Sequence, residues 1–235
     1  MARSMAQRFG IIPPMSSNVY RFFTQHFPAG AERVFIETPS GAPISFRELD
    51  RQSARYAGFL LDLGISKGER VLAQVEKSVE NIYLYLGCLR AGFVYVPLNT
   101  AYQKAEVEYF IGDAQPALVV CRPQSFDTVA PLARAAGVKH VYGLSDANSG
   151  TLIDALPTTE LASHGAVDVV CADDDLASIL YTSGTTGRSK GAMLTHRNLA
   201  SNAQTLVKLW GMSEHDVLIH ALPTFHIHGL FVALH

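Results

Sequence analysis

The chain has 235 residues, of which 48% are hydrophobic and 17% are charged, and its formal net charge is −2. This apolar content is enough to fill a large core, and it excludes general disorder. No block of five like charges occurs, which argues against a nucleic-acid partner. The three cysteines, Cys88, Cys121 and Cys171, lie far apart and form no C-x-x-C pair. We therefore expect buried, reduced thiols and neither a disulfide scaffold nor a zinc site.

The N-terminus carries no apolar segment of the kind found in a signal peptide. No apolar run approaches the roughly 18 residues that span a bilayer, so no membrane span is predicted. We expect residues 2–18 to be a frayed tail, and residues 1–29 to comprise this tail and a first helix. The predicted location is the cytoplasm. The mitochondrial matrix is the alternative, because Arg3, Arg8 and Arg21 resemble the basic residues of a transit peptide.

A short hairpin and a helix are the first predicted elements. Residues 34–38 and 43–45 are typical of two strands around a Pro-Ser-Gly-Ala turn. Ser45 and Glu48 fit a capping box, so we expect a helix to begin at this point and to end at Gly64.

Strands and helices then alternate along the sequence. Continuous apolar runs predict buried strands at residues 71–75, 94–98, 117–121 and 140–144. Apolar positions at helical spacing predict helices at residues 78–90, 104–113 and 124–136. Apolar strands that alternate with helices indicate βαβ units. The predicted fold is therefore α/β, a mainly parallel sheet with helices on both faces.

The composition changes after residue 144. Residues 145–175 are rich in small polar residues and are expected to run over the surface, with a short helix near residues 152–156. A strand at 176–182 and a glycine-rich loop are expected next. A helix at 195–210, a strand at 217–221 and an apolar run at 229–235 are expected after the loop. We divide the chain into an α/β subdomain, residues 30–175, and the start of a second α/β subdomain, residues 176–235.

The final apolar run, GLFVALH, has neither a helix cap nor a polar tail. Because an apolar face needs a packing partner, we expect the chain to be the N-terminal part of a longer protein, truncated within the second subdomain. The alternative is a short final helix that packs on the sheet.

The strongest chemical signal is YTSGTTGRSKG at residues 181–191, between a predicted strand and a predicted helix. Glycines bring backbone N–H groups close to an anion, hydroxyls add neutral donors, and Arg188 and Lys190 supply positive charge. Such a loop suits a polyphosphate. It is not the Walker pattern, because Gly187 precedes Lys190 by three positions and Gly191 follows it. On composition alone, a solvated loop without a ligand remains the alternative.

This segment resembles the phosphate-binding signature of the adenylate-forming superfamily: acyl-CoA synthetases, peptide-synthetase adenylation domains and luciferases. Ser189 stands where proline is commonest in that signature. RAGFVYVPLN at residues 90–99 and LPTFHIHG at residues 222–229 are similar to the family's upstream and downstream motifs. The resemblance covers about residues 30–235. GRSKG together with FHIHGL is most similar to malonyl-CoA synthetases.

The resemblance implies the N-terminal part of the large domain of an adenylate-forming enzyme, an ATP-dependent acid–CoA ligase. ATP, Mg²⁺ and coenzyme A are the implied cofactors and co-substrates, and malonate or a similar carboxylic acid is the implied substrate. The residues expected to embrace the β- and γ-phosphates are Thr182, Ser183, Gly184, Thr185, Thr186, Gly187, Arg188, Ser189 and Lys190. His226 is expected at the acyl-adenylate pocket as a catalytic residue, and Phe225, His226 and His228 are expected to contact the substrate.

Several polar residues also have plainer interpretations. His226 and His228 are compatible with structural roles or with a metal pair, but no third ligand is legible, so no metal site is predicted. The carboxylates of residues 173–175 cannot all face one ion from a strand, and we interpret them as a solvated start to the next strand. Three tyrosines are expected in the core rather than against a nucleotide: Tyr83, Tyr85 and Tyr95.

Two classes of function stay open. The first is the ligase, present here without the later family motifs, which would lie beyond His235; the chain alone is then expected to be inactive. The second is a non-catalytic, truncated α/β module that keeps a nucleotide-phosphate loop. A Rossmann dehydrogenase is excluded, because no G-x-G-x-x-G follows the first strand.

Overall fold

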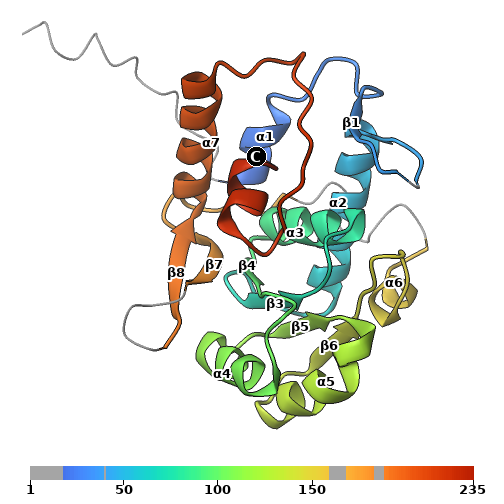
Figure 1. Cartoon of the computed structure of the whole chain (residues 1–235), viewed down its shortest axis with the longest axis vertical. Helices are drawn as coiled ribbons and strands as arrows, with labels where there is room; N and C mark the ends of the chain where they lie inside the picture. The colour runs from blue at the N-terminus through green and yellow to red at the C-terminus, as the bar shows by residue number, and fades with distance from the viewer. Residues whose placement is uncertain (1–17, 40, 159–167, 183–187) are drawn as a thin grey trace, which may run out of the picture.

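The computed structural model describes residues 18–39, 41–158, 168–182 and 188–235 (Figure 1). The described helices are α1 (Val19–Thr24), α2 (Phe46–Asp62), α3 (Val79–Ala91), α4 (Lys104–Ala114), α5 (Phe126–Ala135), α6 (Thr151–Ala155) and α7 (His196–Trp210). The strands are β1 (Val34–Ile36), β2 (Ile44–Ser45), β3 (Arg70–Gln74), β4 (Val94–Pro97), β5 (Leu118–Cys121), β6 (His140–Gly143), β7 (Leu176–Thr182) and β8 (Lys190–Thr195). Two short turns complete the set, the 3-10 turn η1 (Pro123–Ser125) and the π-turn η2 (His228–Val232).

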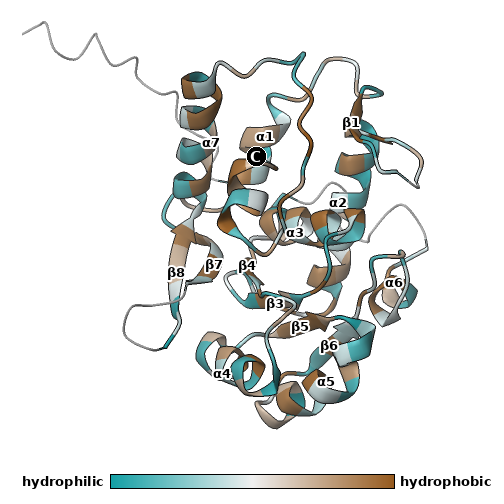
Figure 2. Ribbon diagram, in the orientation of Figure 1, coloured by the Kyte–Doolittle hydropathy of each residue, from teal (hydrophilic) through white to brown (hydrophobic). Residues whose placement is uncertain are grey.

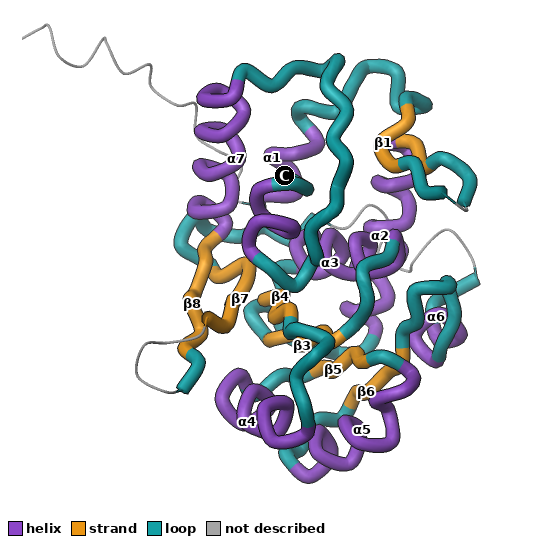
Figure 3. The backbone as a smooth tube through the Cα atoms, in the orientation of Figure 1, coloured by secondary structure: helices purple, strands orange, loops and turns teal. Residues whose placement is uncertain are grey.

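A six-stranded sheet in the order β6-β5-β3-β4-β7-β8 is the centre of the described part of the chain. Its strands from β6 to β7 pair in parallel, and β8 returns antiparallel to β7. The hairpin β1–β2 forms separately, as predicted. Figure 3 shows the strands in orange at the middle of the molecule, with helices on both sides. The predicted α/β fold with a mainly parallel sheet is confirmed.

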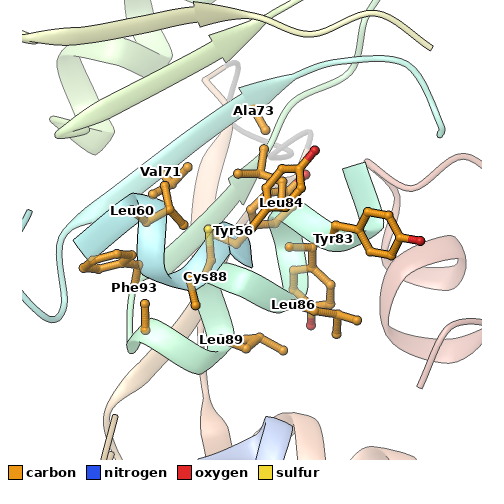
Figure 4. Close-up of a cluster of buried hydrophobic side chains, with 14 of the residues drawn as sticks. Tyr56, Leu60, Val71, Ala73, Tyr83, Leu84, Leu86, Cys88, Leu89 and Phe93 are labelled. Carbon is orange, nitrogen blue, oxygen red and sulfur yellow. The ribbon is translucent and has the colours of Figure 1, made fainter. Parts of the chain in front are cut away.

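The pleat of β3 shows how one strand serves two cores. Val71 and Ala73 belong to a buried cluster with residues of α2 and α3, such as Leu60 and Leu84 (Figure 4). Leu72, between them, belongs to a second cluster with residues of α4 and α5. Because successive side chains of a strand point to opposite faces, a strand covered on both faces must be apolar throughout. This is why the apolar runs in the sequence locate these strands within one or two residues.

Caps place the helix boundaries close to the predicted ones. The Glu48 N–H donates to Ser45 Oγ at 3.2 Å, so Ser45 is the N-cap of α2. The other half of the expected capping box is not made, because the Glu48 carboxylate accepts from Arg51 and Gln52 instead. At the end of α3, Gly92 adopts the left-handed conformation with φ 71° that favours glycine.

Two predicted elements near the glycine-rich segment are corrected. The segment does not lead directly into a helix, because residues 190–195 first form β8. Residues 217–221 form no strand, and Val217 and Ile219 are 93% and 88% exposed. Figure 2 shows apolar residues along this stretch between α7 and the C-terminal turn.

The final apolar run has packing partners within the chain, which the sequence did not indicate. Leu230 and Phe231, in η2, are buried. The Phe231 ring lies against Tyr85 of α3, and its carbonyl accepts from Asn202 of α7 at 3.0 Å. The run therefore ends in a short helical turn, as the alternative expected, but the contacts of Phe231 are to helices α3 and α7 rather than to the sheet. This packing does not bear on the expectation of a longer protein.

One residue from each of the two predicted surface segments makes polar contacts at the end of α3. Asn18 is not frayed, because its amide donates to the carbonyls of Leu89 and Val169, each at 2.9 Å. Asp168, expected on a surface connection, forms an ion pair at 3.0 Å with Arg90, whose side chain is only 3% exposed. Asn18, Asp168 and Val169 therefore contact the end of α3, whereas Val170 is exposed.

Cys88, Cys121 and Cys171 are buried and unpaired, as expected. The tyrosines expected in the core, Tyr83, Tyr85 and Tyr95, are buried too. Within the described ranges, no helix is long and apolar enough to cross a bilayer. β7 and β8 continue the same sheet as β3 to β6, so the proposed division after residue 175 does not coincide with a break in the sheet, and it stays a prediction.

Candidate functional site

The strands β7 and β8 bring together the two ends of the glycine-rich segment. Thr182, the last residue of β7, lies opposite Lys190, the first residue of β8. Thr182, Arg188 and Lys190 are exposed, and Ser189 is half-buried. The other predicted phosphate contacts lie outside the described residues: Ser183, Gly184, Thr185, Thr186 and Gly187. The end of the hairpin thus presents a hydroxyl and two cations to solvent.

This end of the hairpin lies at the carboxyl edge of the parallel sheet. β3, β4 and β7 run in the same direction, so the residues that follow β3 and β4 lie at the same edge as Thr182. In open parallel sheets, ligands bind in the crevice outside the carboxyl ends of the strands. The position of Arg188 and Lys190 therefore suits an anionic ligand.

The histidine-containing segment is held at the same edge. Lys77, which follows β3, donates to the His220 carbonyl at 2.7 Å. Asn81, in the first turn of α3, donates to Thr224 Oγ1 at 3.0 Å and accepts from the Tyr95 hydroxyl at 2.6 Å. These bonds fix residues 220–224 over the start of α3.

His226 and His228 lie together on the surface. Their rings stack with centroids 5.1 Å apart, and the His228 N–H donates to His226 Nδ1 at 3.3 Å. Phe225 beside them is half-buried. Gly229 permits this turn: a Cβ at that position would lie 2.8 Å from the carbonyl carbon of Pro223 and overlap its oxygen. Two accessible imidazoles here are able to donate hydrogen bonds to a carboxylate.

The acidic residues give no metal centre in the described part of the chain. No three His, Cys, Asp or Glu side chains gather there in a way that would hold an ion. Asp174 pairs with Arg197, and Asp175 pairs with Lys67 at 2.6 Å. These partners keep the two carboxylates apart, which agrees with the interpretation of residues 173–175 as the solvated start of β7.

A buried histidine that the sequence did not single out lies at the start of α7. His196 Nδ1 accepts from the Val19 N–H at 3.1 Å and so ties α1 to α7. Burial lowers the pKa of His196 to about 4, which leaves its ring neutral at pH 7. Its Nε2 is buried without a partner among the described residues.

Sequence reasoning also missed Lys77 and Asn81. Neither belongs to a recognisable motif. Their position just after β3 was the available signal, because residues that follow parallel strands collect at the ligand-binding edge. Sequence spacing could not show that residues 220–224, more than 140 positions later, would lie over them.

A family model described as "AMP-binding enzyme" matches residues 23–235. The chain belongs to the AMP-binding enzyme family. Among curated relatives, malonate–CoA ligase ACSF3 of Mus musculus is 35% identical over 72% of the chain and 28% of the relative. Oxalate–CoA ligase of Arabidopsis thaliana is 33% identical over 74% of the chain and 34% of the relative.

Among solved structures, ATP-bound MatB from Rhodopseudomonas palustris is 48% identical to this chain, with a TM-score of 0.87. The match covers 94% of this chain and 43% of MatB. The chain therefore spans less than half the length of MatB and roughly a third of the two curated relatives.

Proposed function

We propose that this chain is the phosphate-binding and acyl-pocket part of an ATP-dependent acid–CoA ligase, with malonate or a similar small dicarboxylic acid as substrate. The observation that carries the proposal is the β7–β8 hairpin end, which presents Thr182, Arg188 and Lys190 at the carboxyl edge of the sheet. The acid is suggested by the malonate–CoA ligase relative, and the nucleotide by the ATP bound to MatB.

The proposed reaction has two steps. An oxygen of the acid's carboxylate attacks the α-phosphorus of ATP, and the bond to pyrophosphate breaks. The thiol of coenzyme A then attacks the acyl carbon of the adenylate, and AMP leaves. Both steps depend on positioning and on the stabilisation of charge.

Lys190 and Arg188 are proposed to neutralise the charge that develops on the departing pyrophosphate. Thr182 is proposed to donate a neutral hydrogen bond to the phosphates. The same role is proposed for residues 183–187 and for Ser189. His226 is proposed to donate a hydrogen bond to the substrate carboxylate, with His228 and Phe225 beside it in the acyl pocket.

Mg²⁺ is expected to accompany ATP and to screen its phosphates. The described residues gather no three carboxylate or imidazole side chains around one point, so they do not by themselves form its site. The location proposed for the enzyme is the cytoplasm, with the mitochondrial matrix as the alternative, since ACSF3 is named as mitochondrial.

The test joins the full chain to the part of R. palustris MatB that it does not match. Pyrophosphate release is measured with ATP, Mg²⁺ and a panel of acids: malonate, oxalate, acetate and a long-chain fatty acid. We expect release with malonate above the other acids, followed by thioester formation when coenzyme A is added. His226→Ala should reduce malonate-dependent release, whereas His215→Ala, at an exposed histidine between α7 and the apolar segment, serves as the matched control.

Two results would contradict the proposal. A folded chimera that binds ATP but releases no pyrophosphate with any acid would favour the non-catalytic module. A chimera that prefers oxalate or the fatty acid, while MatB itself prefers malonate, would show that this chain's part of the pocket selects another acid.

A further inference from the structure

Helix α4 lies against the end of the β7–β8 hairpin at which the glycine-rich segment joins the two strands (Figure 1). It contacts both strand ends, Tyr181 of β7 and Ser189 just before β8, through side chains one helical turn apart, Asp113 and Tyr109. Residues four positions apart lie on one helical face, so α4 presents a pair of polar contacts to the two strand ends.

The contact to β7 is a short hydrogen bond. The Tyr181 hydroxyl donates to Asp113 Oδ2 at 2.6 Å, and the Tyr181 ring packs on Phe110 with centroids 4.5 Å apart. Burial, and the hydrogen bond to the Asp113 carboxylate, raise the pKa of Tyr181 well above its ordinary value. The hydroxyl therefore keeps its proton and remains the donor.

The contact to β8 involves a second tyrosine. The Tyr109 hydroxyl donates to the Ser189 carbonyl at 2.9 Å, one residue before Lys190. The Arg188 guanidinium lies over the Tyr109 ring at 5.9 Å from its centroid, within the range of a cation–π interaction. Tyr109 thus contacts both Arg188 and Ser189.

Gly191 makes room for this arrangement. It lies opposite Tyr181 in the hairpin, and a Cβ at Gly191 would be 2.7 Å from Ile179 Cγ2 and 3.4 Å from the Tyr181 ring. The absence of a side chain lets the Tyr181 ring lie across β8 while its hydroxyl reaches Asp113. Tyr181 and Gly191 are the first and last residues of YTSGTTGRSKG. Both are therefore explained by packing within the hairpin, independently of phosphate chemistry.

We propose that α4 anchors both strand ends of the glycine-rich segment, with Tyr109 and Asp113 as positioning residues that hold Arg188 and Lys190 for adenylation. The catalytic consequence rests on the proposed function, whereas the anchoring itself does not. Neither side chain needs to touch ATP: each acts through the strand end that it holds.

Anchoring is tested on the full 235-residue chain by limited proteolysis with trypsin under native conditions. Cleavage after Lys190 requires the end of β8 to open, so its rate reports the stability of that end. Tyr109→Phe removes one hydroxyl and should speed this cleavage about 5-fold. Asp113→Ala removes a charged acceptor and should speed it about 10-fold.

Conservative and matched variants separate anchoring from general damage. Asp113→Asn keeps an oxygen that accepts from Tyr181, so its cleavage rate should lie near that of the parent. Tyr142→Phe removes a tyrosine hydroxyl in β6, far along the sheet, and Glu108→Ala removes another exposed carboxylate of α4. Both should leave cleavage after Lys190 unchanged, and all variants should keep the parent Tm within a few degrees.

The catalytic consequence is tested in the chimera with MatB. Tyr109→Phe and Asp113→Ala should slow acid-dependent pyrophosphate release by factors similar to those seen in proteolysis. Thioester formation from preformed acyl-adenylate should proceed at the parent rate, because no triphosphate is present in that step.

Unchanged cleavage after Lys190 in both variants would overturn the anchoring. Faster cleavage with unaltered pyrophosphate release in an active chimera would overturn the positioning role. If the parent chimera releases no pyrophosphate at all, the proposed function fails, while the proteolysis still decides whether α4 is the anchor.

Discussion

His196 illustrates how burial sets the chemistry of a single side chain. Its ring lies at the first position of α7 and accepts the Val19 N–H, which ties the start of the described chain to a helix 177 positions later. The charged groups that act on it are Asp175, which favours the protonated ring, and Lys67, which opposes it. Desolvation outweighs both, so the neutral form is preferred in the folded state.

This preference predicts that acid weakens the fold. The pKa of His196 is about 4 in the folded chain, against an ordinary value of 6.5, so below pH 6.5 the unfolded state binds more protons. The destabilisation by His196 is absent above about pH 7, and it grows as pH falls until the pH passes the pKa of the folded chain near 4. Between pH 7 and pH 5, His196 should lower the free energy of unfolding by about 2 kcal/mol.

The measurement is urea unfolding of the parent and of His196→Asn at several pH values. The asparagine keeps an acceptor for the Val19 N–H but does not titrate, so the difference between the two proteins should shrink as pH falls. His235, whose pKa burial lowers to about 3, adds a trend of the same sign to both proteins and cancels in the comparison. Parallel pH profiles for the two proteins would contradict this account of His196.

At the scale of elements, β8 and residues 217–221 show where sequence patterns fail. Residues 190–195 do not alternate clearly between apolar and polar, yet they form a strand because β7 offers a paired edge. Val217 and Ile219 have strong β-propensity, yet no strand forms because nothing pairs with them in the described chain. Strand formation depends on cross-strand partners, which local sequence does not specify.

Part of the candidate site was predictable from the sequence and part was not. The motif located Thr182, Arg188 and Lys190, and their exposed position at the sheet edge followed from the parallel fold. The contacts made by Tyr109 and Asp113 did not follow, because α4 is separated from β8 by about 80 positions. An amphipathic pattern shows which face of a helix is buried but does not show which strand end that face will meet.

The turn at residues 222–229 gives a prediction about Gly229. Its missing side chain allows the close approach of the Pro223 carbonyl, and the atoms in the way belong to the backbone. Gly229→Ala should therefore destabilise the chain by about 1–3 kcal/mol in urea unfolding, as overpacking does elsewhere.

Gly112→Ala is the matched control for this substitution. Gly112 lies in α4, and a Cβ there would meet nothing within 4 Å. Alanine is the better helix former, so this variant should gain about 0.5–1 kcal/mol. Equal stability of the two alanine variants would show that the Pro223 approach is not constrained as described.

At the scale of the whole molecule, the alternation of strands and helices was enough to predict the sheet. It was not enough to predict which surfaces stay uncovered. Apolar side chains remain exposed at Leu209, Trp210, Val217, Leu218, Ile219 and Leu222, from the end of α7 onward. Large exposed apolar surface favours association.

We therefore predict that the purified 235-residue chain self-associates through these residues. Val217→Asp combined with Ile219→Asp should lower the associated fraction in sedimentation velocity, with little change in Tm because both side chains are already solvated. Val170→Asp, at a 74% exposed valine between α6 and β7, is the control and should leave association unchanged. An equal effect of the control would mean that added charge alone, rather than these side chains, governs association.

The most direct test of the central claim is the rate of each half-reaction in the MatB chimera when Lys190 is replaced by alanine. Loss of a charge-assisted contact costs about 1.5–3 kcal/mol, so Lys190→Ala should slow pyrophosphate release by roughly 10- to 150-fold. With preformed acyl-adenylate and coenzyme A, the same variant should form thioester at the parent rate. Lys208→Ala, at an exposed lysine near the end of α7, should alter neither step. Equal slowing of both steps by Lys190→Ala would show that the hairpin end supports the fold rather than the departing pyrophosphate, and it would contradict the account.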